Sequence, residues 1–159
     1  MKVFLGTDHA GFALKEDIKS FLRIARYEVV DCGAYGFDPD DDYPGFVSKA
    51  ATGVAGEPPA SGSKGIVFGK SGAGECIVAN KIKGIRAALG FNERNVELAR
   101  THNDANVLCL GSDFVKPELA KALVKLFLET PFSGEQRHIR RIEKIKGIEL
   151  EAKSNSSRK

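Results

Sequence analysis

The chain has 159 residues, of which 42% are hydrophobic and 28% are charged, as in an ordinary globular protein. Its formal net charge of +3 is too small to indicate nucleic acid as a partner. No apolar run approaches the ~20 residues that a membrane span needs, so no membrane association is expected either. The length predicts a single domain.

Three cysteines without CxxC spacing favour free thiols in a reducing compartment over a disulfide framework. They are Cys32, Cys76 and Cys109. The chain also opens without the basic and apolar segments of a secretion signal. We therefore expect a cytoplasmic location.

Five short apolar segments alternate with longer amphipathic segments along the chain. The apolar segments predict buried strands at 2–7, 28–33, 65–69, 84–90 and 105–111. The amphipathic segments predict helices at 11–27, 46–55, 74–82, 92–103 and 116–130, and a last short helix at 133–145. Between the second strand and the second helix, an acidic loop rich in proline and glycine is expected at 34–46.

This alternation predicts an α/β fold with a single doubly wound (Rossmann-like, flavodoxin-like) five-stranded parallel sheet and helices on both faces. In such a sheet, ligands bind beyond the carboxyl ends of the strands, where the strand order reverses. We expect the domain to span residues 1–147 and the polar residues 148–159 to form a flexible tail.

The loop after the third predicted strand contains Gly69, Gly72 and Gly74. Glycines at these positions let consecutive backbone N–H groups point to one place at the start of a helix, which suits a phosphate or a developing oxyanion. A glycine-rich turn without a ligand is the plainer alternative. The loop lacks the spacing of the Walker A and GxGxxG motifs, so no nucleotide cofactor is expected.

Glu75 follows this loop, in the first turn of the next predicted helix. The helix dipole favours a carboxylate there, so a capping role explains the residue. Alternatively, burial beside a bound substrate raises its pKa into the range of a general base. The residues of this loop alone do not separate the two interpretations.

Two further pairs of residues are candidates for a binding site. His102 and Asn103 end a predicted helix, where a histidine is usually structural. Arg137 and Arg141 lie four residues apart, hence on one helix face, and suit a phosphate; a solvated basic face is the alternative.

The three histidines lie far apart in the sequence and no cysteine has ligand spacing, so no metal site is expected. What remains is the acid Glu75, the histidines His102 and His9, of which His9 follows the first predicted strand beside Asp8, the anion-binding loop and the paired arginines. Together these residue types predict acid–base chemistry on a small phosphorylated substrate.

Five segments of the chain resemble one known family, the ribose-5-phosphate isomerase type B family, which also includes subunits of galactose-6-phosphate isomerase. They occur in the family's order, from residue 2 to about residue 146. The segments are "GTDHAGFALKEDI", "DDYPGF", "GKSGAGECIVANKIKGIRAAL", "ARTHNDANVLCLG" and "RHIRRIEKI".

The resemblance implies an aldose–ketose isomerase that interconverts ribose 5-phosphate and ribulose 5-phosphate through a cis-enediolate, without a metal. It implies that Asp8 and His9 line the site, with His9 near the phosphate, and that Tyr43 contacts the sugar. Ser71 and the backbone amides of residues 70–74 are implied to hold the substrate oxygens and to stabilise the enediolate.

The resemblance also implies a homodimer or homotetramer whose active sites are shared between subunits. His102 and Asn103 are then supplied by the neighbouring subunit, where His102 helps to open the sugar ring. Arg137 and Arg141 bind the phosphate, with Lys70 or Lys116 as a further candidate.

Two positions depart from the commonest pattern of the family. Many members carry a cysteine base where this chain has Gly69, whereas a second branch lacks it and uses the glutamate that corresponds to Glu75. The resemblance therefore implies that Glu75 carries the proton. The family commonly has a phosphate-binding arginine where this chain has Asp113, and an acid there repels a phosphate.

Two alternatives to ribose-5-phosphate isomerisation stay open. One is an isomerase of another sugar phosphate, with a hexose or a tetrose. The other is a protein that binds a phosphosugar without catalysis.

Overall fold

The computed structural model describes residues 1–156 and contains a five-stranded parallel sheet with the strand order β2–β1–β3–β5–β4. The strands are β1 (Lys2–Thr7), β2 (Glu28–Asp31), β3 (Lys64–Gly69), β4 (Ala87–Gly90) and β5 (Val107–Gly111). The α-helices are α1 (Phe12–Ile24), α2 (Tyr43–Gly56), α3 (Ala73–Ala79), α4 (Glu93–Asn103), α5 (Pro117–Glu129) and α6 (Gln136–Ser156), and the short 3-10 helices are η1 (His9–Gly11) and η2 (Pro59–Ser61). The predicted doubly wound α/β fold is confirmed.

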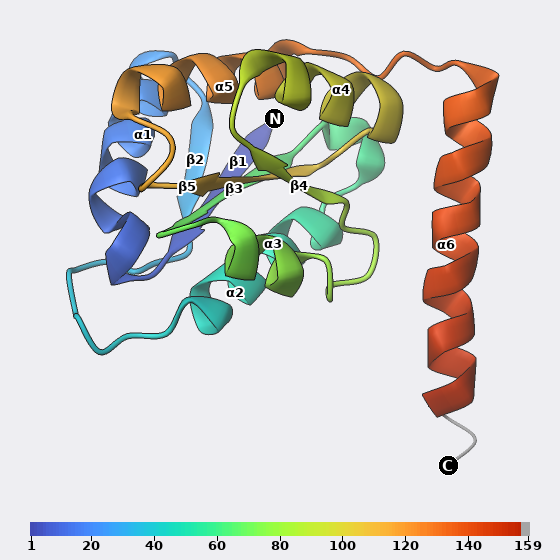
Figure 1. Cartoon of the computed structure of the whole chain (residues 1–159), viewed down its shortest axis with the longest axis horizontal. Coiled ribbons are helices and arrows are strands. Elements are labelled where there is room, and N and C mark those ends of the chain that lie inside the picture. Colours follow the sequence, from blue (N-terminus) through green and yellow to red (C-terminus); the bar gives the residue numbers. More distant parts are fainter. Residues whose placement is uncertain (157–159) are drawn as a thin grey trace.

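The sheet separates two layers of helices (Figure 1), with α1, α4 and α5 on one face and α2 and α3 on the other. Successive side chains of β1 alternate between the two layers, because strand residues point to opposite faces. Val3 and Leu5 belong to the core under α1 and α5, whereas Phe4 belongs to the core under α2. Every residue of β3 and β5 is buried, which explains why both are apolar apart from Lys64 at the start of β3.

The strand order reverses between β1 and β3. From β1 the chain moves outward to β2 and then returns to form β3 on the other side of β1. Thr7 and Phe68, near the carboxyl ends of these two strands, are register partners. In a doubly wound sheet this reversal, beyond the carboxyl ends of the strands, is where a ligand is expected.

Strand β4 begins at Ala87, later than the predicted start at residue 84. The N–H of Ile85 donates to the carbonyl of Ile82 at 3.1 Å, so this stretch forms a turn. The side chain of Ile85 is nevertheless buried. The predicted boundary was wrong because this residue is apolar and buried without pairing in the sheet.

The last helix is longer than predicted. The sequence predicts a short helix that ends near Ile145, but α6 continues to Ser156 and includes part of the predicted tail. The segment 149–153 is rich in residues of high helix propensity, and its polar character hid this signal. Residues 157–159 lie outside the described part of the chain.

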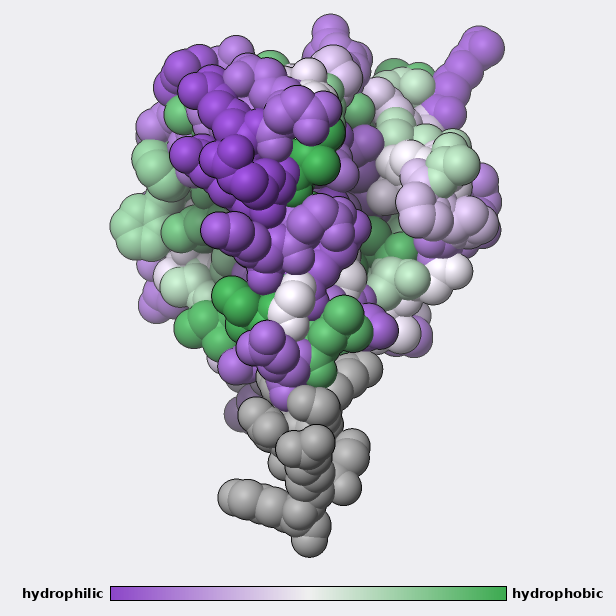
Figure 2. All heavy atoms as spheres, turned by 90° about the vertical axis from the view of Figure 1, so that its right-hand side faces the viewer, coloured by the Kyte–Doolittle hydropathy of each residue, from purple (hydrophilic) through white to green (hydrophobic). Residues whose placement is uncertain are grey.

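Helix α6 stands beside the layered body rather than against either face of the sheet (Figure 1). A groove of about 530 Å³ lies between the helix and the body. Figure 2 faces this side and shows hydrophobic residues interrupting a mostly hydrophilic surface. The exposed apolar side chains of α6 are Ile139, Ile145, Ile148 and Leu150. Within residues 1–156, no helix has both the length and the apolar character that a bilayer crossing requires.

Candidate active site

The carboxylate of Glu75 occupies the space directly beyond β3. A Cβ atom added to Gly69, the last residue of β3, would lie 1.8 Å from Oε1 of Glu75. The carboxylate fits there because position 69 has no side chain. Glu75 is only 4% exposed. The predicted acid is therefore placed at the carboxyl ends of the central strands.

Burial raises the pKa of Glu75, and the negative charge of Asp8 adds to the rise. Hydrogen bonds from the backbone N–H groups of Glu75 and Gly72 act in the opposite direction. The carboxylate thus contacts the first turn of α3, as a helix cap does, and is desolvated, as a general base is. The two interpretations of this residue are compatible.

Steric contacts explain why the loop has glycine at positions 72 and 74. Gly72 has φ +77° and precedes α3, and a Cβ atom there would lie 2.7 Å from Cδ1 of Leu89. A Cβ atom on Gly74 would lie 2.7 Å from the hydroxyl oxygen of Tyr43. The missing side chain at position 74 therefore lets the Tyr43 ring approach α3 beside Glu75, so these predicted site residues lie together.

Lys70 and Ser71 are exposed at the tip of this loop. Oγ of Ser71 accepts a hydrogen bond from the N–H of Ala73 at 3.2 Å. The carbonyl of Lys70 accepts the N–H of Asp113 at 3.1 Å, which joins the loops after β3 and β5. The exposed Asp113 is therefore a neighbour of the predicted anion-binding loop.

Asp8 and His9 follow β1 at the same edge of the sheet. Asp8 is buried and caps η1, because its Oδ1 accepts the N–H of Ala10 at 3.0 Å. Nδ1 of His9 lies 2.8 Å from Oδ1 of Asp41, and the same oxygen accepts the backbone N–H of His9 at 2.8 Å. The hydrogen bond to Asp41 raises the pKa of His9.

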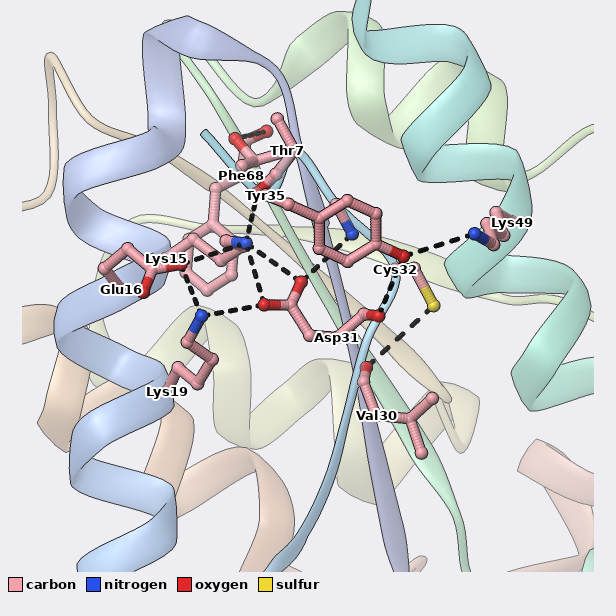
Figure 3. Close-up of polar contacts among 12 residues, drawn as sticks. Thr7, Lys15, Glu16, Lys19, Val30, Asp31, Cys32, Tyr35, Lys49 and Phe68 are labelled. Atoms are coloured by element: carbon pink, nitrogen blue, oxygen red, sulfur yellow. Dashed lines mark hydrogen bonds and ion pairs between the residues drawn. The ribbon is translucent and has the colours of Figure 1, made fainter. Parts of the chain in front are cut away.

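A buried lysine fixes the start of the loop that carries Asp41 (Figure 3). Lys15 of α1 is fully buried, and its Nζ donates to Oδ1 of Asp31 at 2.9 Å and to the carbonyl of Ala34 at 2.5 Å. Lys19 approaches the other carboxylate oxygen of Asp31 at 2.7 Å. A buried charge is tolerated only with such partners. The end of β2 is therefore held against α1.

His102 and Asn103 lie beyond the amino ends of the strands, at the opposite edge of the sheet from Glu75, which lies beyond their carboxyl ends. They end α4, which leads into the amino end of β5. The carbonyl of Asn103 accepts a hydrogen bond at 2.8 Å from Nε of Arg86, the residue directly before β4. The structure therefore does not bring these two predicted residues to Glu75 within one chain.

Arg137 and Arg141 belong to the same edge as His102. His138, between them in α6, stacks on His102 with ring centroids 4.1 Å apart and an interplanar angle of 16°. Both arginines are exposed, and Nε of Arg137 pairs with Oε2 of Glu135 at 2.8 Å. Helical spacing places the two arginines on one face of α6, as predicted.

One cluster of potential metal ligands is present among the described residues. It consists of Asp8, His9 and Asp41, whose ligand-type atoms lie within 4.8 Å of one another. Nδ1 of His9 and Oδ1 of Asp41 already share a hydrogen bond at 2.8 Å. In this cluster a proton shared between Nδ1 of His9 and Oδ1 of Asp41 occupies the position that a metal ion would take.

Two residues of this region were not identified from the sequence. Asp41 had a signal, because it belongs to the run of acids that precedes Tyr43. Gly11 follows the "DHA" segment, and a Cβ atom there would lie 2.8 Å from the backbone nitrogen of Gly69. Its missing side chain lets η1 approach the end of β3.

Known proteins resemble this chain over most of its length. Ribose-5-phosphate isomerase B of Mycobacterium tuberculosis is 46% identical over 143 residues, which cover 90% of this chain and 86% of the relative. Ribose-5-phosphate isomerase B of Escherichia coli is 40% identical over 148 residues, with coverages of 93% and 96%.

Solved structures agree with these sequence relatives. Ribose-5-phosphate isomerase B of Clostridium thermocellum superposes with a TM-score of 0.88 at 42% identity, covering 96% of this chain and 99% of the other. The Mycoplasma genitalium enzyme with bound ribulose-5-phosphate also has a TM-score of 0.88 at 42% identity, with coverages of 94% and 97%. The family model described as Ribose/Galactose Isomerase matches residues 3–145. The chain belongs to the ribose/galactose isomerase family.

Proposed function

We propose that this protein is a ribose-5-phosphate isomerase that interconverts ribose 5-phosphate and ribulose 5-phosphate by moving a proton between C1 and C2. The observation that carries the proposal is the buried carboxylate of Glu75 in the space beside Gly69, at the point where the strand order reverses. The names of the relatives support the choice of substrate.

Glu75 is the proposed proton carrier. It removes the proton from C2 of the open-chain sugar and returns it to C1, through a cis-enediolate, while the proton of the C2 hydroxyl passes to the oxygen on C1. A general base works best when its pKa approaches the operating pH, and burial moves the pKa of Glu75 in that direction. Ser71 and the amides of residues 70–74 hold the negative charge that develops on the sugar oxygen.

Ring opening and phosphate binding require the second group of residues. In the proposed mechanism His102 accepts the proton of the anomeric hydroxyl while a neighbouring group protonates the ring oxygen. Asn103 contacts the sugar, and Arg137 and Arg141 bind the phosphate. Because these residues lie at the opposite edge of the sheet from Glu75, a second copy of the chain must supply them. We therefore propose a homodimer, or a homotetramer built from it, with shared sites.

The surface of α6 supports this assembly. The helix carries exposed apolar side chains and stands beside the layered body, so a partner surface is available there. Covering exposed apolar side chains of this kind with a neighbouring subunit removes apolar surface from water and stabilises the assembly. A cytoplasmic location is part of the proposal and is supported by the three free cysteines.

A second candidate is an isomerase of another sugar phosphate. Asp113 favours it, because this exposed acid lies beside Lys70 at the predicted anion-binding loop. A carboxylate there weakens the binding of a nearby phosphate and favours substrates whose phosphate lies further from the loop. A panel of pentose, hexose and tetrose phosphates, compared by kcat/KM, separates the two candidates.

The proposal is tested with the purified wild-type protein and Glu75→Gln. Glutamine keeps the shape of the side chain and removes the base, so we expect isomerisation to fall by about 10²- to 10⁴-fold. Exchange of the C2 hydrogen with deuterium from the solvent is measured in parallel. A wild-type protein that binds the sugar without exchange is a binding protein rather than an isomerase. If the Glu75→Gln variant has wild-type activity, Glu75 is not the proton carrier.

A further inference from the structure

We infer that Asp41 is a positioning residue for His9. It fixes the orientation of the imidazole ring and keeps the ring charged, so that Nε2–H faces the anionic group of the substrate. The inference rests on the proposed function, because it takes a sugar phosphate as the ligand of His9.

A single oxygen of Asp41 binds His9 at two points. Oδ1 accepts hydrogen bonds from Nδ1 and from the backbone N–H of His9, each at 2.8 Å. An ionised carboxylate only accepts, so Nδ1 carries the proton. Two bonds from one residue fix both the ring and the carboxylate. With Nδ1 engaged, Nε2 is the ring nitrogen that can meet a ligand.

Asp41 lies on the inner side of the pair and His9 on the solvent side. The side chain of Asp41 is 10% exposed, whereas that of His9 is 34% exposed. The acid therefore lies behind the ring, and the ring lies between the acid and solvent. Phe37 approaches the ring edge-on, with centroids 6.1 Å apart and an interplanar angle of 83°. This contact further restricts the ring.

The carboxylate of Asp41 needs a positive partner. Its second oxygen, Oδ2, is buried and has no hydrogen-bond partner within the described residues. A buried carboxylate with an unpaired oxygen is costly, and each such group requires an explanation. Oδ1 has its partner in the His9 ring, whose Nδ1 lies 2.8 Å away, and a protonated ring is the cation that offsets the charge of this carboxylate. The pair therefore stabilises the charged ring.

The electrostatics of His9 agree with the geometry. The charged groups that face the ring are Asp41, from the loop before α2, and Asp8, from the end of β1. The hydrogen bond to Asp41 is the largest cause of the raised pKa of His9, burial opposes it, and the charge of Asp8 adds to the rise. His9 therefore stays charged at a higher pH than an ordinary histidine.

The pair lies between two fixed points of the fold. Asp41 and His9 are 32 residues apart in the sequence, and the loop between β2 and α2 brings Asp41 to His9. That loop is held at Ala34 by Lys15 and ends at Tyr43, whose ring is packed against Gly74. Asp41 is thus held in place beside the candidate active site.

The expected kinetic effect falls on KM rather than on kcat. The phosphate is remote from C1 and C2, so a charge that binds it acts equally on the substrate and on the transition state. Binding by a charged ring is fully present at low pH and is lost as the pH rises through the pKa of His9. Removing the charge of Asp41 moves this loss to lower pH.

The test compares Asp41→Asn with the matched control Asp40→Asn. Asp40 precedes Asp41 in the same loop and is exposed, so its replacement removes one negative charge without breaking the pair. The pKa of His9 is measured by NMR in each protein, with His9→Gln to assign the signal. KM and kcat for ribose 5-phosphate are measured from pH 6 to pH 8.5, and circular dichroism checks the fold.

We expect Asp41→Asn to lower the pKa of His9 by about one unit, which is about a tenfold change in proton affinity. KM at pH 8 then rises by up to about tenfold, converges with the wild-type value at pH 6, and leaves kcat within about twofold. Asp40→Asn keeps the wild-type values. A His9 pKa and a KM–pH curve unchanged in Asp41→Asn would overturn the inference.

Failure of the inference and failure of the proposed function are distinguishable. The NMR titration does not depend on turnover, and a wild-type His9 pKa at or below the ordinary value overturns the inference even when Asp41→Asn fails to fold. If the wild type does not isomerise ribose 5-phosphate, sulfate serves as the probe, because its charge is constant between pH 6 and pH 8. Weaker sulfate binding at pH 8 in Asp41→Asn than in Asp40→Asn then supports the pair, and equal binding overturns it.

Discussion

The carboxylate of Glu75 and the missing side chain of Gly69 share one space at the end of β3. A Cβ atom at position 69 would approach Oε1 to 1.8 Å, which is far inside contact distance. Most of the β3 side chains pack into the cores, so the strand does not move to relieve the clash. The position of the proposed base therefore depends on Gly69 as much as on Glu75 itself.

Gly69→Ala tests this dependence. The added methyl group displaces the carboxylate of Glu75 from the space beyond β3, and we expect kcat to fall by about 10²-fold or more, the lower bound for loss of a general base. Steady-state kinetics measure the effect. Gly45→Ala is the control, because Gly45 lies in α2 with nothing within 4 Å of an added Cβ atom. A Gly69→Ala variant with wild-type kcat would show that the carboxylate acts from elsewhere.

The raised pKa of Glu75 predicts opposite effects on activity and stability. The base acts only when ionised, so kcat falls as the pH decreases through the raised pKa. The protonated form stabilises the fold, and that contribution is fully present below the ordinary pKa of glutamate and is lost as the pH rises through the raised value. At pH 7 the ionised carboxylate is therefore destabilising.

Glu75→Gln should accordingly raise Tm at pH 7, with a difference from the wild type that shrinks toward pH 4. Thermal unfolding followed by circular dichroism measures it. Glu118→Gln is the matched control, because Glu118 also lies in the first turn of a helix but is exposed. A lower Tm for Glu75→Gln at pH 7 would mean that capping of α3 outweighs the cost of burial.

Shared sites predict recovery of activity in mixed dimers. Glu75→Gln and His102→Asn each inactivate both sites of a homodimer, but a mixed dimer contains one intact site. Random mixing after subunit exchange should restore about a quarter of the wild-type activity, since half of the dimers are mixed and each has one of two sites intact. Activity that stays at the level of the separate variants would place all residues in one chain.

Asp113→Arg tests the acid beside the anion-binding loop. The substitution replaces a repelling charge by a donor suited to phosphate, and we expect KM for ribose 5-phosphate to fall by about three- to tenfold with little change in kcat. Glu129→Arg, which makes the same charge change at an exposed position at the end of α5, is the control. An unchanged or higher KM in Asp113→Arg would show that the phosphate does not reach this loop.

Local patterns in the sequence determined the strands, most helices and the glycine loop of this protein. Apolar strands buried on both faces and helices with one apolar side have their own periods, so they are recognisable without knowledge of the fold. The glycines at positions 69, 72 and 74 were likewise visible as a loop before a helix. The predicted start of β4 was wrong because Ile85 is buried in a turn rather than in a strand. The predicted end of α6 was wrong because the helix continues through a polar segment of high helix propensity.

Contacts between distant segments were decided only by the tertiary structure. His9 meets Asp41 because the loops after β1 and β2 converge at one edge of the sheet. The carboxylate of Glu75 fits beside Gly69 because α3 turns back over the end of β3. His102 is kept from Glu75 because α4 runs antiparallel to the strands and ends at the other edge. Periodicity reports which face of its own element a side chain occupies, whereas these distances depend on how the whole chain crosses the sheet.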